Sequence, residues 1–439
     1  MNTPICDFVK KYAQSDFLRL HMPGHKGKTL LGMEGLDITE IFGADSLYEA
    51  DGIIAQSEEN ASKLFGCRTF YSTEGASQCI RAMLYLVLQQ AKRQKRTPLI
   101  AAGRNAHKAF LSAVALLDLP VQWLYPENSG SYLSCSLTPA QLESYLQNAQ
   151  EKPAAVYLTS PDYLGKVADI SALSEVCHRY GVLLLVDNAH GAYLRFLPES
   201  LHPMDLGADM CCDSAHKTLP ALTGAAYLHL SETLSGLQVK NAMMLFGSTS
   251  PSYLILQSLD AVNLYLDSYP QRLAAFLPEV QALKDKLQKN GHVLYGDEPL
   301  KLTLDAAAYG CTGEELAAYL RRQKIEPEFA DREYVVLMLT PEISLQRLEQ
   351  ALCAVPQKPP VEKPELPFAA AQQVLSVREA MLSQSEILPA KQCLGRIVAV
   401  PTVGCPPAVP ILVCGERVTQ QAIDLFAYYG ITECCVVKE

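Results

Sequence analysis

The segment 209–224 holds the residues of this chain best suited to covalent chemistry. A short apolar run ends at Asp213, and Ser214, His216 and Lys217 follow within four residues. We expect Lys217 to lie on a turn at the end of a strand. A lysine held there can form a Schiff base with a carbonyl cofactor, and neighbouring serine and histidine side chains can bind an anion. A motif this short also fits a solvated loop lysine, so the other motifs of the chain must decide.

A second polar turn, Gly75-Ala76-Ser77, stands at the start of a predicted helix. Apolar residues follow it at the spacing of one buried helical face: Ile80, Met83, Leu84, Val87 and Leu88. The first backbone N–H groups of a helix point outward and favour a phosphate. The turn therefore predicts an anion site, although the same residues also fit a simple helix cap.

From residue 99 onward, apolar runs alternate with helical patterns, which predicts an α/β fold with a mostly parallel sheet. The expected strands are Leu99–Ala102, Val121–Leu124, Ala155–Thr159, Val182–Val186, Met210–Cys212 and Ala225–His229. Polar motifs follow four of them: Arg104–His107, Ser160–Gly165, Asp187–Gly191 and Ser214–Lys217. Ligands of open α/β sheets bind at the carboxyl ends of the strands, so these motifs predict a ligand site.

Together these residue types suit pyridoxal 5'-phosphate (PLP). Lys217 would hold the aldehyde, and Asp187 would keep the pyridine nitrogen protonated so that the ring can accept an electron pair. The phosphate would be held by Gly75, Ala76, Ser77, Ser214 and His216. His107 could stack on the ring. Taken singly, Asp187 also fits a helix cap, and His107 and His190 also fit ordinary loop histidines.

Composition restricts the remaining function classes. The 439 residues carry a net charge of −10, which disfavours nucleic acid or an anionic membrane as the main partner. The apolar runs are shorter than a membrane span, and the first nineteen residues lack the apolar core of a secretory signal. Fourteen cysteines without C-x-x-C spacing indicate a reducing, cytoplasmic setting and predict no metal site.

In their order along the chain, the motifs resemble those of the Orn/Lys/Arg decarboxylase family, PLP enzymes with the aspartate-aminotransferase type of fold. The resembling stretches are Leu20–Gly27, Asp37–Ile41, Arg104–Lys108, Val186–Gly191, Ser214–Gly224, Ser248–Tyr253 and, more loosely, Cys405–Pro410 with Gly415 and Glu416. They span nearly the whole chain and are similar to the short members, which lack an N-terminal receiver-like domain.

The resemblance implies the type of fold, and the residue patterns along the chain predict its boundaries. We expect an aspartate-aminotransferase-like large domain with a mostly parallel sheet, a smaller α+β domain and a C-terminal region. The expected segments are a turn-rich N-terminal arm at 1–60, the PLP-binding large domain at 61–269, the small α+β domain at 270–355, a Pro-rich linker at 356–367 and the C-terminal decarboxylase-type region at 368–439. We expect a helix near Ala369–Leu382 in the last segment.

The resemblance also implies the reaction and the role of each site residue. The expected activity is decarboxylation of lysine, arginine or ornithine to the corresponding amine in a homodimer, as part of polyamine synthesis. Lys217 would be the Schiff-base lysine, Asp187 the partner of the ring nitrogen, His107 the stacking ring and His190 a neighbour of cofactor and substrate. The implied phosphate ligands are Ser77, Ser214 and His216 from one subunit and Thr249 and Ser250 from the other.

Several positions depart from the family pattern. Glu74 and Ala76 alter the phosphate turn, Asn188 replaces the usual Glu beside Asp187, and Asp162 replaces the usual Thr of a Ser-Pro-Thr-Tyr turn. Ala408 stands where the pattern has Gly. Glu74 and Asp162 are the available carboxylates for the distal cation of a basic substrate. The choice of basic amino acid stays open, as do two alternatives: another PLP reaction on the same fold, such as transamination or lyase chemistry, and a PLP-binding protein with little turnover.

Overall fold

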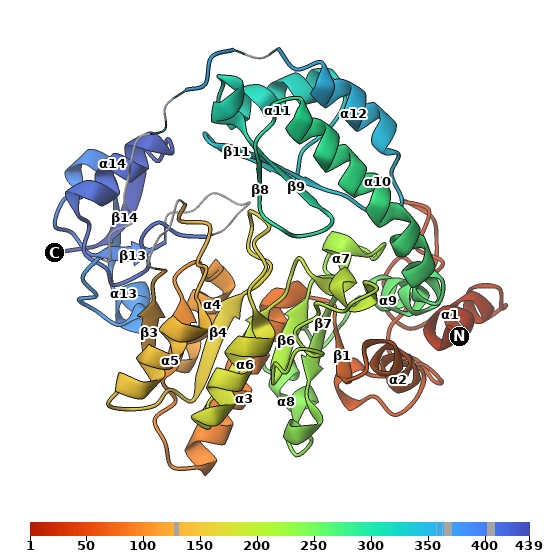
Figure 1. Cartoon of the computed structure of the whole chain (residues 1–439). Helices are drawn as coiled ribbons and strands as arrows, with labels where there is room; N and C mark the ends of the chain where they lie inside the picture. The colour runs from red at the N-terminus through yellow and green to blue at the C-terminus, as the bar shows by residue number, and fades with distance from the viewer. Residues whose placement is uncertain (127–130, 357, 362, 364–370, 402–408) are drawn as a thin grey trace. The chain divides into compact units, whose positions relative to one another are not determined.

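The computed structural model describes residues 1–126, 131–356, 358–361, 363, 371–401 and 409–439. Figure 1 labels the helices and strands of the chain. The chain divides into two compact units. Unit 1 contains Met1–Thr97 and Ile170–Arg272, and unit 2 contains Pro98–Asp169 and Leu273–Glu439.

Along the sequence of unit 1, helices precede and follow the strands. Its helices are α1 (Pro4–Ala13), α2 (Ile53–Phe65), α3 (Gly75–Arg93), α6 (Ile170–Arg179), α7 (Ala215–Thr218), α8 (Val239–Met244) and α9 (Tyr253–Leu266), with 3-10 turns η1 (Leu47–Glu49), η2 (Ala192–Phe196) and η3 (Glu232–Leu234). Its strands are β1 (Arg68–Ser72), β5 (Leu183–Asp187), β6 (Met210–Asp213) and β7 (Ala226–Leu230).

Unit 2 combines parallel strands with two smaller antiparallel sheets. Its helices are α4 (Lys108–Leu117), α5 (Pro139–Asn148), most of α10 (Tyr269–Lys289), α11 (Gly313–Arg322), α12 (Leu345–Cys353), α13 (Val377–Leu382) and α14 (Gln420–Tyr428), with η4 (Ala306–Tyr309) and η5 (Ala390–Gln392). Its strands are β2 (Ile100–Gly103), β3 (Val121–Leu124), β4 (Ala155–Thr159), β8 (Leu294–Tyr295), β9 (Lys301–Asp305), β10 (Phe329–Ala330), β11 (Tyr334–Met338), β12 (Ser385–Pro389), β13 (Val398–Val400) and β14 (Glu433–Val437).

The main sheet has seven strands in the order β1-β7-β6-β5-β4-β2-β3. In unit 1, β5 and β6 are parallel, whereas β7 runs antiparallel to both β6 and β1. In unit 2, β2 is parallel to both β3 and β4. The smaller sheets of unit 2 have the orders β10-β11-β9-β8 and β12-β14-β13. The predicted α/β class with a mostly parallel sheet is confirmed.

The core of unit 1 explains why its polar motifs begin at strand ends. Leu184, Leu185 and Val186 of β5 and Cys211 of β6 are fully buried, because helices cover both faces of parallel strands. Helix α3 packs against β6 and β7, and Ile80, Met83, Leu84 and Val87 of its apolar stripe are buried as the spacing predicts, whereas Leu88 is half-buried. Polar side chains can therefore reach solvent or a ligand only at the last strand residue or beyond it.

Two expectations about the ends of the chain need correction. The arm expected at 1–60 begins with a regular helix, α1, whose Ile5 and Val9 are fully buried. The helix expected near Ala369–Leu382 begins at Val377, where Ser376 and Glu379 form a capping box. Residues 371–376 before it are not helical, and 369–370 lie outside the described residues. Half of the linker at 356–367 and residues 405–408 of the Cys405–Pro410 motif also lie outside them.

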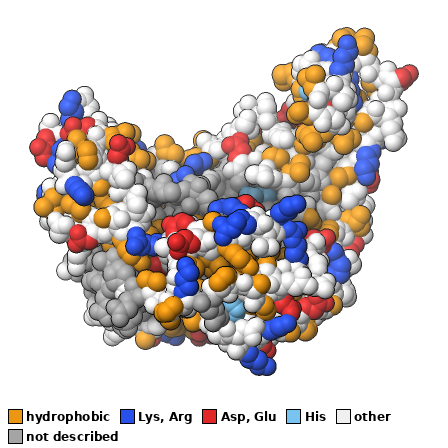
Figure 2. Space-filling view, turned by 90° about the horizontal axis from the view of Figure 1, so that it is seen from above, with side chains coloured by type: hydrophobic (Ala, Val, Ile, Leu, Met, Phe, Trp, Pro, Cys, Tyr) orange, Lys and Arg blue, Asp and Glu red, His pale blue; other side chains and the backbone are white. Residues whose placement is uncertain are grey.

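The surface mixes side chains of all kinds. On the face drawn in Figure 2, hydrophobic, basic and acidic side chains are interspersed, so no single charge dominates that view. Each cysteine that the structure describes is a free thiol. Across the described stretches, no helix combines the length and the apolar character needed to cross a membrane.

Candidate active site

Lys217 lies at the carboxyl end of β6, on one short helical turn rather than an open loop. Ser214 precedes α7, and Lys217 is its third residue. The Lys217 Nζ atom lies 3.0 Å from His190 Nε2, although the two residues are 27 positions apart. Both residues sit just beyond strands β5 and β6, which are parallel neighbours. The structure thus brings the predicted nucleophile and one predicted histidine into direct contact.

Asp187 is the last residue of β5 and is buried, with 3% of its surface exposed. Its Oδ1 accepts a hydrogen bond from the Ala189 N–H at 3.2 Å and lies 3.7 Å from the Cys212 thiol. In the strand register, Asp187 stands beside Cys212, five positions before Lys217. The carboxylate is therefore held in the same corner of unit 1 as Lys217.

The predicted phosphate turn at the start of α3 is joined to the lysine segment. The Gly75 N–H donates to the Gly224 carbonyl oxygen at 2.8 Å. Gly224 has a φ of +97°, and a Cβ there would lie 3.0 Å from the Thr73 oxygen, so only glycine fits this close approach. Ala76 is buried and Ser77 is half-buried. This backbone contact places the helix start beside the end of the motif that contains Lys217.

The remaining phosphate candidates have different surroundings. His216 is half-buried, and its Nδ1 lies 2.9 Å from the Ala225 carbonyl oxygen, which accepts the ring hydrogen. Thr249 and Ser250 are exposed. The Ser248 N–H before them donates to a carboxylate oxygen of Glu74 in the same chain. Glu74 therefore fixes the start of this loop against the phosphate turn of its own subunit.

His107 belongs to unit 2, where it caps α4 directly after β2. Its Nδ1 accepts a hydrogen bond from the Ala109 N–H at 3.1 Å, which fixes the ring and leaves the neutral-form proton on Nε2. Nearby, Arg104 donates to the Glu416 carboxylate at 2.8 Å, and both side chains are almost wholly buried. The resembling motifs around positions 104 and 416 are thus held together by a buried ion pair.

Asp162 does not serve as the free carboxylate that we expected for a substrate cation. It is 3% exposed, and its oxygens accept hydrogen bonds from the Ser134 hydroxyl and from the Leu164 and Lys166 N–H groups. Burial raises its pKa to about 6 despite these bonds. These contacts hold the turn after β4 together and join it to Ser134, so within unit 2 this side chain is structural. Glu74 is exposed.

Sequence reasoning missed a buried polar cluster behind the lysine. Asp213 Oδ2 lies 3.0 Å from His202 Nε2 and 3.1 Å from His229 Nε2, and all three residues are fully buried. The Asn188 side chain donates to Asp213 Oδ1 at 2.6 Å. The continuous apolar run at 225–228 could have indicated that His229, which ends it, is buried. No local signal marks His202, which lies in a loop.

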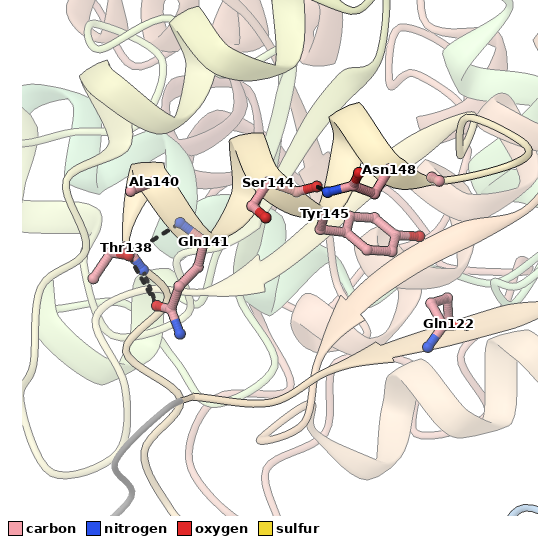
Figure 3. Close-up of a pocket in the computed structure, with 8 residues that line it drawn as sticks. Gln122, Thr138, Ala140, Gln141, Ser144, Tyr145 and Asn148 are labelled. Carbon is pink, nitrogen blue, oxygen red and sulfur yellow. Dashed lines mark hydrogen bonds between the residues drawn. The ribbon is translucent and has the colours of Figure 1, made fainter.

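One surface depression lies away from these residues. It has a volume of about 800 Å³ and lies in unit 2 between Gln122 of β3 and the polar face of α5 (Figure 3). Thr138 and Gln141, joined by hydrogen bonds in Figure 3, form the capping box of that helix. No carboxylate, lysine or histidine is found among the described residues lining it, so it offers no group for acid–base or covalent catalysis.

Two family profiles match the chain. Residues 3–299 match the profile described as Orn/Lys/Arg decarboxylase, major domain, and residues 361–435 match the one described as Orn/Lys/Arg decarboxylase, C-terminal domain. The chain belongs to the Orn/Lys/Arg decarboxylase family. It is thus a PLP-dependent decarboxylase-family enzyme, as the motifs predicted.

Relatives of this decarboxylase-family chain agree with that assignment. It is 29% identical over 465 residues to an arginine decarboxylase of Bacillus subtilis, covering 96% of this chain and 92% of that protein. It is 28% identical to an arginine decarboxylase of Halalkalibacterium halodurans, covering 95% and 91% respectively. Its fold is similar to that of the constitutive lysine decarboxylase of E. coli, with a TM-score of 0.79 at 16% identity over 100% of this chain and 82% of that one.

Proposed function

We propose that this chain binds PLP covalently through Lys217 and decarboxylates a basic amino acid, with arginine as the first candidate. The contact between Lys217 and His190 at the shared carboxyl end of β5 and β6, beside the buried Asp187, carries the proposal. A cluster of a lysine, a carboxylate and a histidine at this edge of an α/β sheet is suited to a carbonyl cofactor.

The residues of unit 1 fit PLP in their chemistry. When bound, PLP supplies an aldehyde that joins amines and a ring that accepts the electron pair left when CO2 departs. Ser214, His216 and the start of α3 would hold the phosphate. The Gly75 N–H already donates to Gly224, so Ala76 and Ser77 supply the N–H groups that an anion can use at this helix end. Thr249 and Ser250 of a second subunit would complete the phosphate site.

Each remaining side chain has a separate task. Asp187, as a carboxylate, would stabilise a protonated ring nitrogen, because an adjacent negative charge favours the charged form. His190 orients the Lys217 amine through their hydrogen bond and can hold or return a proton at that nitrogen. His107 would supply a flat ring to cover the cofactor, with its orientation fixed by the Ala109 N–H.

Arginine is preferred as substrate because relatives at 28–29% identity over nearly the whole chain bear the name arginine decarboxylase. The exposed Glu74 is then the carboxylate of the phosphate-turn region that could meet a distal guanidinium. Charge complementarity of this kind would also reject apolar amino acids, which leave a carboxylate without a partner.

A substrate panel tests the reaction. Purified protein supplied with PLP is incubated with arginine, lysine and ornithine, and CO2 and amine products are measured. We expect CO2 with agmatine from arginine. A keto acid instead of an amine would indicate transamination, and absence of CO2 from all three substrates would refute the decarboxylase proposal.

Covalent attachment is tested independently of turnover. Borohydride reduction of the PLP-loaded protein followed by peptide mapping should place the cofactor on Lys217. The Lys217→Ala variant should lose the visible absorbance of the attached cofactor. Reduction that labels a different lysine would overturn the assignment.

The same proposal includes a homodimer. The segment between α1 and η1 exposes many large apolar side chains, which a second subunit could cover: Phe17, Leu18, Leu20, Met22, Leu30, Leu31, Met33 and Phe42. Exposed apolar patches of this kind commonly mark protein interfaces. We also propose that the amine product serves polyamine synthesis and that the second subunit supplies part of the phosphate site.

A further inference from the structure

A buried carboxylate directly precedes the lysine motif and is bonded on both of its oxygens. Asp213 is the last residue of β6, and its neighbour is Ser214. Its Oδ2 faces the Nε2 atoms of His202 and His229 at 3.0 and 3.1 Å. Burial by itself would raise its pKa, but the electrostatic attraction and hydrogen bonds of the His202 and His229 rings outweigh burial and hold the pKa below its usual value. The carboxylate is therefore ionised.

The other oxygen of Asp213 holds the loop that carries Asp187 and His190. The Asn188 Nδ2 donates to Asp213 Oδ1 at 2.6 Å, and the Asn188 N–H donates to the Cys212 oxygen at 3.0 Å. Asn188 is fully buried and packs so closely on Gly191 that a Cβ on this glycine would lie 2.0 Å from Asn188 Oδ1. One side chain of β6 thus fixes the turn after β5.

We propose that Asp213 is a positioning residue, which holds the Asp187–His190 turn at the distance from Ser214 and Lys217 that PLP binding requires, with Asn188 as its matched partner. This inference rests on the proposed PLP function and deepens it. Asp187 directly precedes Asn188 in the chain, and Ser214 directly follows Asp213. The Asn188–Asp213 hydrogen bond therefore links the two segments that carry Asp187 and Ser214. Any change at Asp213 therefore alters the spacing of groups expected to hold opposite ends of the cofactor.

Asn188 supplies the hydrogen-bond donor that the Asp213 carboxylate needs. An amide nitrogen donates to Asp213, whereas a carboxylate at position 188 would place two negative charges within hydrogen-bond distance in a buried site, which is strongly unfavourable. The Asn in place of the family's usual Glu is accordingly explained by Asp213 in the same chain. A substrate contact is not needed to explain this substitution, because the Asn188 side chain is buried.

The hydrogen-bond pattern favours this role over a metal site. His202, Cys211, Asp213 and His229 have possible ligand atoms within 4.8 Å of one another. However, the Met204 N–H donates to His202 Nδ1 at 3.4 Å, so the proton of the neutral ring lies on Nε2, which faces Asp213. A protonated ring nitrogen donates a hydrogen bond and cannot ligate a metal.

The experiment measures PLP binding by the apo-protein of four variants, without substrate. Asp213→Asn removes the charge, and its amide cannot accept from both Asn188 and the histidines. We expect its dissociation constant for PLP to rise about 10-fold or more, since a buried charge-assisted hydrogen bond is lost. Asn188→Asp should weaken binding similarly. The double variant Asn188→Asp with Asp213→Asn restores one amide facing one carboxylate, and should recover most of the affinity.

Asp209→Asn is the matched control. Asp209 is buried just before β6, and its Oδ2 accepts from the Leu184 N–H at 2.8 Å and contacts His178 Nε2 at 3.0 Å. It joins the same two strands at the opposite end. We expect Asp209→Asn to lower the melting temperature but to leave the PLP dissociation constant within about twofold of wild type, which separates positioning from general stability.

The outcomes separate the inference from the function on which it rests. Wild type without PLP binding would overturn both. Wild type that binds PLP, with Asp213→Asn binding equally well or the double variant no better than either single variant, would overturn the inference alone. Stoichiometric zinc in purified wild type that is lost in Asp213→Asn would reassign the cluster as a metal site. If Asp213→Asn does not fold, Asn188→Ala decides, because it removes only the one donor and should weaken PLP binding by the same mechanism.

Discussion

The buried ion pair between Arg104 and Glu416 offers the sharpest test of how unit 2 is held together. Both side chains are 3% exposed or less, and the Arg104 guanidinium also donates to the carbonyl oxygens of Pro410 and Ile411. Glu416 in turn accepts from the Val413 N–H at 2.8 Å. The perturbation is Glu416→Ala, which leaves a guanidinium buried without its counter-charge.

The magnitude follows from the 2.8 Å separation and the burial. At an effective dielectric constant of about 20, two charges at that distance attract by about 6 kcal/mol, and the cost of removing both from water offsets much of this. Removing only the carboxylate keeps the desolvation cost of Arg104 and loses the attraction. We expect Glu416→Ala to lower the free energy of unfolding by about 3–5 kcal/mol. Glu416→Gln keeps an acceptor oxygen and should cost less.

The assay is urea unfolding followed by tryptophan fluorescence. The chain has one tryptophan, Trp123 on β3, and the Arg104 guanidinium carbon lies 5.5 Å from its ring centroid, so the signal reports on this part of unit 2. Glu326→Gln, which breaks the exposed pair with Arg321, is the control and should change stability by less than about 1 kcal/mol. A loss below about 1 kcal/mol for Glu416→Ala would refute the reasoning.

Three further predictions concern catalysis, pH and assembly. Asp187→Asn keeps the shape but removes the charge, so kcat should fall by about 10²-fold or more, and full activity in a CO2-release assay would contradict its proposed role. Asp162 has a folded pKa of about 6, above the usual aspartate value of 3.8, so the protein loses stability as the pH rises through this interval. Compared with Asp162→Asn by urea unfolding, wild type should accordingly gain stability between pH 7 and pH 4, and a constant difference would show that the carboxyl does not titrate there. Phe42→Asp combined with Leu31→Asp should shift the homodimer toward monomer in analytical ultracentrifugation, because both side chains are exposed apolar groups of the arm; an unchanged sedimentation coefficient would exclude these residues from the interface.

Local pattern was sufficient to predict several of the regular elements. The strands at Val121–Leu124 and Ala155–Thr159 have the predicted bounds, and α9 begins directly after Ser252, whose side chain caps it. Parallel strands buried on both faces appear as continuous apolar runs, and caps have local residue preferences, so the signal lies within a few residues. Helix α1 was missed because its buried stripe is short and polar residues surround it.

The candidate site was likewise predicted in part from the sequence, and the rest required the structure. Motif spacing alone nominated Lys217, Asp187 and His190 at the ends of neighbouring strands, because the carboxyl ends of parallel strands meet at one edge of a sheet. The contact between Lys217 and His190 and the link from Gly75 to Gly224 required the folded chain.

Only the tertiary structure decided the role of the buried polar residues. The sequence indicated that Asp162 and Asn188 are unusual, but their hydrogen bonds to Ser134 and Asp213 come from residues 28 and 25 positions away. His202 reaches Asp213 from a loop without any periodic pattern. Such partners depend on distances between packed elements, and burial then makes each polar contact obligatory, since a buried group without a partner is costly. A local pattern contains the residue type but not that distance.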